Sequence, residues 1–68
     1  MPDRTPVQWR QLCAIARALL TADPTIDNLE WSERIKARIL ALGYTYPEAP
    51  DAIHRAMRAV DRQGRRAA

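Results

Sequence analysis

Residues 27–43 read DNLEWSERIKARILALG, and this stretch decides the fold class. It opens on Asp27, a good helix-capping residue, and Glu30 follows three positions later, as in a capping box. It closes on Gly43, a residue suited to the left-handed position after a helix. Its apolar residues recur at helical spacing; they are Trp31, Ile35, Ile39 and Leu42. The stretch therefore predicts an amphipathic helix over about residues 28–42.

A helix is also predicted upstream, over about residues 6–22. Thr5 is a good N-cap residue and Pro6 suits the first helical position, whereas Asp23 and Pro24 prevent the helix from continuing. The apolar residues of this segment fall in one arc of a helical wheel; they are Trp9, Leu12, Cys13, Ile15, Ala16, Leu19 and Leu20. We expect the whole arc, including its tryptophan, to pack into a core.

A third helix is predicted downstream, over residues 47–63 or 50–63. Thr45 followed by Glu48 forms a capping pattern that favours the earlier start, at Tyr46 or just after it, whereas Pro50 is best tolerated in the first turn and favours the later one. Its apolar residues form a narrow stripe; they are Ala49, Ile53, Ala56, Met57 and Val60. Residues 64–68 then form a short basic C-terminal tail.

Three amphipathic helices joined by short loops predict an all-α fold, a compact three-helix bundle that forms a single domain over residues 1–68. No segment alternates apolar and polar residues for long enough to form a strand. A chain of 68 residues buries only a modest core, and phenylalanine is absent, so two tryptophans and two tyrosines supply all the aromatic bulk. We expect the first helix to pack across the other two.

Residues that carry catalysis or bind metals are sparse. His54 is the only histidine, and a lone histidine without a second ligand is not a metal site. Cys13 is the only cysteine and falls on a predicted buried face, which indicates a core residue rather than a nucleophile. We therefore expect no enzyme, no cofactor and no metal. A single cysteine also excludes an internal disulfide, which fits the cytoplasm, and no apolar run reaches the roughly 20 residues that span a membrane.

The predicted second helix carries apolar residues on a second side. Leu29 and Leu40 lie about 120–140° from the main stripe on a helical wheel, and Ile26 could extend this side. Tyr44 and Tyr46 flank the following loop, where an exposed tyrosine would be a good contact anchor. These five residues are candidates for protein binding by an adaptor, inhibitor or regulator, possibly a homodimer. The alternative interpretation is that this side packs against a neighbouring helix.

Positive charge is concentrated near the C-terminus. The chain carries a net charge of +3, and the excess lies in five arginines that could follow a phosphate backbone: Arg55, Arg58, Arg62, Arg65 and Arg66. Residues 41–45 resemble the turn of a helix-turn-helix, which would make the third helix the recognition helix. Against this, Glu48 and Asp51 would bring acidic groups to the DNA. A nucleic-acid-binding regulator is therefore the alternative function, and a solvated basic face is the plain interpretation.

Overall fold

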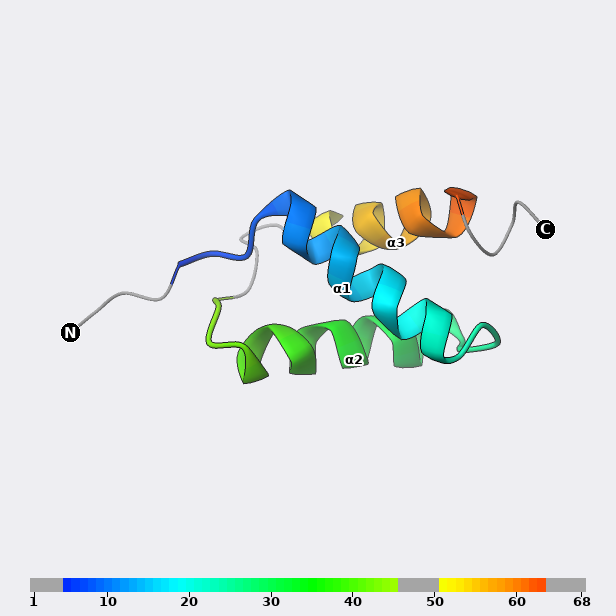
Figure 1. The fold of residues 1–68 in the computed structure, drawn as a ribbon, viewed down its shortest axis with the longest axis horizontal. Coiled ribbons are helices and arrows are strands. Elements are labelled where there is room, and N and C mark those ends of the chain that lie inside the picture. Colours follow the sequence, from blue (N-terminus) through cyan, green and yellow to red (C-terminus); the bar gives the residue numbers. More distant parts are fainter. Residues whose placement is uncertain (1–4, 46–50, 64–68) are drawn as a thin grey trace.

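The computed structural model describes residues 5–45 and 51–63. Over this part of the chain it contains three helices, α1 (Trp9–Ala22), α2 (Asn28–Ala41) and α3 (Asp51–Gln63), and no strand longer than an isolated bridge. Helix α1 crosses the other two and packs against both, whereas α2 and α3 contact each other less (Figure 1). The predicted all-α three-helix bundle is confirmed. Which of the two predicted starts of the third helix applies depends on residues outside the described part.

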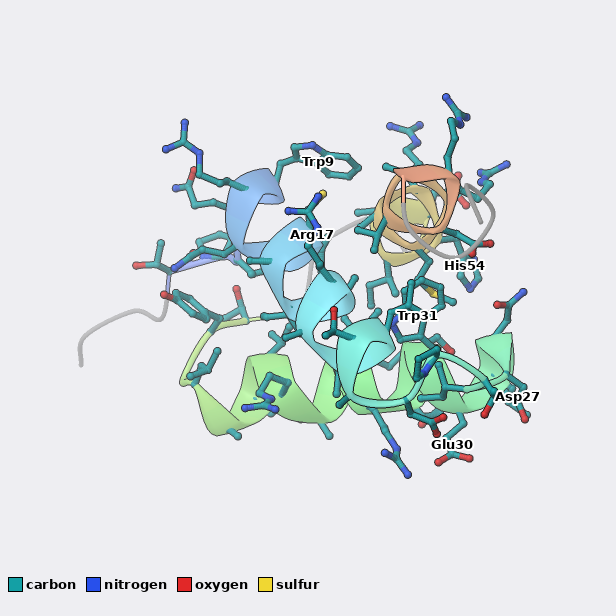
Figure 2. All side chains as sticks on the ribbon, turned by 45° about the vertical axis from the view of Figure 1, so that its right-hand side comes forward. Trp9, Arg17, Asp27, Glu30, Trp31 and His54 are labelled. Carbon is teal, nitrogen blue, oxygen red and sulfur yellow. The ribbon has the colours of Figure 1, made fainter. Side chains whose placement is uncertain are left out.

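Helices α2 and α3 cross steeply instead of lying side by side. Figure 2 looks almost along the axis of α3, while α2 runs across the same view. Each of the two helices has one side that faces the centre of the bundle and an opposite side that faces away from it. This arrangement leaves α2 with a long outer face that no other described helix covers.

The ends of α2 are determined by local chemistry, as its sequence predicts. The Asp27 carboxylate accepts a hydrogen bond of 2.8 Å from the backbone N–H of Glu30. At the other end, Gly43 has a φ of 87°, and its N–H donates to the carbonyl of Leu40 over 3.0 Å. The N–H of Tyr44 donates to the carbonyl of Ile39 over 3.1 Å, which completes a Schellman motif. Regular helix ends at Ala41, one residue before the predicted end.

The predicted start of α1 at residue 6 is wrong. The helix begins at Trp9, after an N-cap residue, Gln8, whose side chain makes no capping bond. The preceding residues are extended instead: the carbonyl of Thr5 accepts a 3.3 Å hydrogen bond from the N–H of Thr45, and Val7 is buried. This pairing joins segments far apart in the sequence, so a capping pattern, which is local, does not reveal it.

The core lies where the three helices meet. Trp31 is completely buried, and Figure 2 shows its ring rising from α2 between the other two helices. Its indole Nε1–H donates a 3.1 Å hydrogen bond to the carbonyl of Ala16 on α1. The other buried apolar residues of the core come from all three helices, from the segment before α1 and from the turn before α2; they are Val7, Leu12, Ile15, Ala16, Leu20, Ile26, Ile35, Ile39, Ile53, Ala56, Met57 and Val60. The bundle therefore has one shared centre.

Two residues predicted to belong to this core lie largely outside it. Trp9 is 51% exposed and Leu42 is 55% exposed. Trp9 is the first residue of α1. Leu42 follows the last regular residue of α2, and the chain then turns through Gly43, so the helical spacing no longer determines its direction. A wheel gives the angle of a side chain, but it does not say whether a neighbour covers it.

Candidate functional site

The strongest candidate site is the outer face of α2, formed by Leu29, Glu33, Lys36 and Leu40. Leu29 is 75% exposed and Leu40 is 45% exposed, although both lie on a well-formed helix. The opposite side of the same helix carries Trp31 and the isoleucines of the core. The two leucines therefore do not face a neighbouring helix, which removes the alternative interpretation of this side as internal packing.

Charged residues separate the two leucines on this face. The Nζ atom of Lys36 lies 3.6 Å from the Oε2 atom of Glu33, and both side chains are about half exposed. A second ion pair joins Arg34 to Glu30 on the adjoining side of the helix. Exposed pairs of this kind contribute little to stability, about 0.3–0.5 kcal/mol each. The pair of Glu33 and Lys36 gives the outer face a charged middle, with an apolar residue at each end.

Ile26 does not extend the outer face, so this part of the prediction is wrong. Its side chain is only 3% exposed and belongs to the core. The turn between α1 and α2 directs it inward: Oδ1 of Asp23 accepts bonds from the N–H and the hydroxyl of Thr25, and the carbonyl of Asp23 accepts a 3.1 Å bond from the N–H of Ile26. This compact turn rotates Ile26 away from the direction of Leu29.

Of the two tyrosines predicted as contact anchors after α2, the structure describes one. Tyr44 is half-buried, packs against the core, and accepts a hydrogen bond at its hydroxyl from Nε2 of Gln11 on α1. This contact ties α1 to the end of α2, so much of the Tyr44 ring is used inside the fold. Tyr46 lies outside the described residues. Of the two tyrosines in the predicted contact surface, the structure therefore describes only Tyr44, and it describes that ring as half-buried.

The arginine stripe of α3 is present as far as the structure describes it. Arg55, Arg58 and Arg62 are all exposed, on the side of α3 opposite its buried stripe. No ion pair among the described residues involves these three arginines. Arg65 and Arg66 lie outside the described residues. The stripe is thus a cationic surface that presents its guanidinium groups to solvent.

A cleft that sequence analysis missed opens between the start of α2 and α3. It has a volume of about 420 Å³ and is lined by Asn28, Trp31, His54, Met57, Arg58 and Asp61. Asp61 is only 6% exposed, despite its charge. The one sequence signal was that Asp61 lies about 40° from Met57 on the α3 wheel, at the edge of the apolar side. The cleft combines a carboxylate, an imidazole, a guanidinium and an amide over an apolar floor, which offers both hydrogen-bond donors and acceptors.

The described residues offer no metal centre, and their one thiol is poorly activated. No group of three or more histidine, cysteine, aspartate or glutamate side chains in residues 5–45 and 51–63 is placed to hold a metal ion. Burial raises the pKa of the Cys13 thiol, an effect that the charge of Arg17 partly offsets. The thiol is therefore protonated at neutral pH and is a weak nucleophile. None of the described helices is long and apolar enough to cross a membrane.

A scan against protein-family models finds no match, and searches of curated proteins and of solved structures find no similar chain. The functional inference therefore depends on the surface chemistry described above.

Proposed function

We propose that this protein is a non-enzymatic binding module, an adaptor, inhibitor or regulator, that acts by placing the outer face of α2 against another protein chain. The observation that most supports this proposal is that Leu29 is 75% exposed although it lies on a regular helix. Leu40 adds a second apolar contact on the same face. Exposed apolar residues on one face of a rigid helix, with charged residues between them, can serve as the apolar anchors of a protein–protein contact site.

Two substitutions test the proposed surface. Leu29→Arg and Leu40→Arg each place a charge in the contact, so we expect each to reduce partner capture at least tenfold, which is the effect of about 1.4 kcal/mol. The measurement is quantitative pull-down from the source cells with immobilised wild-type and variant proteins, in nuclease-treated extract. Ala14→Arg, on the exposed side of α1, adds the same charge away from the site and is the matched control.

Capture that Leu29→Arg and Leu40→Arg leave unchanged, while circular dichroism shows folded protein, would exclude the outer face of α2 as the contact surface. A loss with Ala14→Arg of equal size would indicate that any added charge disturbs capture. Both leucines are exposed, so we expect the substitutions to change the free energy of unfolding by less than about 0.5 kcal/mol.

A second candidate function is nucleic-acid binding through α3. The observation that favours it is the row of three exposed arginines, Arg55, Arg58 and Arg62, without an ion pair among the described residues. The steep crossing of α2 and α3 is also the arrangement of a helix-turn-helix corner. Asp51, in the first turn of α3, opposes this function, because it would approach the phosphates.

An electrophoretic mobility shift assay decides on this second function. If the arginine stripe binds nucleic acid, the double variant Arg58→Glu, Arg62→Glu should lose at least tenfold in affinity, since each phosphate contact contributes to a salt-dependent attraction. The wild-type affinity should also fall steeply between about 50 mM and about 200 mM salt. The control is Arg34→Glu, the same charge change on α2. A binding affinity that changes neither with salt concentration nor in the double variant would exclude the arginine stripe as the nucleic-acid-binding surface.

We propose that the protein acts in the cytoplasm. Cys13 is a free thiol that is half-buried in the fold, and unpaired cysteines of this kind persist in reducing compartments. This location agrees with a binding module that meets its partner inside the cell.

A further inference from the structure

We propose that the partner on the outer face of α2 is a second copy of this chain, bound antiparallel about a two-fold axis that passes between Arg34 and Ile35. This inference rests on the proposed protein-binding function and specifies its partner. It is carried by the order of side chains on the outer face, in which Leu29, Glu33, Lys36 and Leu40 form a pattern complementary to its own reversal.

The four side chains form one continuous seam. Their spacings of four, three and four residues place them within about 60° of each other on the helix, along about 16 Å of its axis. This is the spacing of a coiled-coil seam, which packs at a shallow crossing angle of about 20°. All four residues are available, since both leucines are exposed and the two charged side chains are 63% and 45% exposed. The seam is therefore straight, accessible and long enough for a helix-to-helix contact.

The seam is self-complementary only when the second helix runs in the opposite direction. The pair Leu29 and Leu40 and the pair Glu33 and Lys36 share one midpoint along the helix. A two-fold axis at this midpoint places Leu29 against Leu40 of the partner subunit, and Glu33 against Lys36 of the partner subunit. Both ends of the contact are then apolar, and the centre holds two pairs of opposite charge, as an isologous interface requires.

A parallel arrangement of the same two helices is unfavourable. It would place Glu33 against Glu33 of the partner subunit and Lys36 against Lys36 of the partner subunit, and both contacts join like charges. An unrelated partner would not require the charges and leucines of α2 to share a midpoint. The chemistry of the face therefore selects a second copy and also its direction.

The expected dimer is weak and reversible. Two leucine layers on a helix of 14 residues bury less than the roughly 1,200 Å² of a standard stable interface. The central ion pairs determine direction and specificity more than they add affinity. The association is therefore expected at protein concentrations between about 10 µM and about 1 mM, in the range of transient contacts.

A charge exchange across the seam tests the proposal by sedimentation equilibrium. Glu33→Lys alone and Lys36→Glu alone each turn both central contacts of the homodimer into like-charge pairs, and each should raise the dissociation constant at least about fivefold. An equimolar mixture of the two variants restores opposite charges in both contacts. The mixture should therefore form a heterodimer with a dissociation constant within about twofold of the wild type.

The matched control is Glu30→Lys, the same charge change on the adjoining side of α2, which should leave the dissociation constant within about twofold of the wild type. Two results would overturn the proposal: a wild-type protein that stays monomeric at about 1 mM, or a mixture that associates no more tightly than either variant alone. A monomer that still loses partner capture with Leu29→Arg would refute the second copy but keep the broader protein-binding function.

Cross-linking checks the direction independently. In a Cys13→Ala background, which removes the native thiol, Leu29→Cys and Leu40→Cys variants are oxidised separately and as a mixture. The antiparallel dimer brings position 29 to position 40 of the other copy, so the mixture should give the disulfide-linked product and each variant alone should give little. A product from Leu29→Cys alone that equals the mixture would show a parallel or random contact and contradict the proposal.

Discussion

Replacing Trp31 with alanine is expected to leave the protein largely unfolded at 25 °C. Trp31 is 0% exposed, lies where the three helices meet, and donates a hydrogen bond to the carbonyl of Ala16. Truncation of a fully buried tryptophan costs about 3–5 kcal/mol. A domain of this size has only about 3–5 kcal/mol of stability to lose. Far-UV circular dichroism during a urea titration should therefore show little helix and no cooperative transition.

Trp9→Ala is the matched control, because it is the same chemical change at a different burial. Trp9 is 51% exposed on the first turn of α1. We expect this variant to lose at most about 1.5 kcal/mol and to keep a cooperative transition. Equal losses for the two variants would mean that the packing of α1 across α2 and α3 is different from the one described.

Replacing Ile26 with alanine should destabilise the protein by about 2–4 kcal/mol, whereas Leu29→Ala should cost less than about 0.5 kcal/mol. The two residues stand three positions apart, and both were expected on one exposed side. Ile26 is 3% exposed and contributes to the core, whereas Leu29 is 75% exposed. The free energies of unfolding from urea titrations at a fixed low protein concentration compare them directly.

The same pair separates stability from association. Leu29→Ala should weaken the proposed dimer while the monomer stays folded, whereas Ile26→Ala should lower stability without changing the outer face of α2. If Leu29→Ala proved as destabilising as Ile26→Ala in the monomer, Leu29 would have to be covered within the fold, and the proposed binding surface would be lost.

Much of the two proposed binding surfaces was predictable from sequence, because each of them lies on a single helix. The positions of Leu29 and Leu40, and of Arg55, Arg58 and Arg62, follow from helical spacing, and the structure places all of them on exposed sides. The prediction failed for Ile26, which lies in a turn where no periodicity applies. It also missed the cleft beside Asp61. That cleft is lined by residues of both α2 and α3, and the sequence contains no pattern that predicts which side chains of two separate helices lie together.

The sequence by itself determined the local structure of this protein: the two ends of α2 at Asp27 and Gly43, and the apolar stripe that makes each helix amphipathic. These follow from hydrogen bonds and side-chain spacing within a few residues. Only the tertiary structure decided that Thr5 pairs with Thr45, that Trp31 fills the centre, and that Trp9 does not. Burial depends on which neighbour arrives to exclude water, and that neighbour comes from a distant part of the chain.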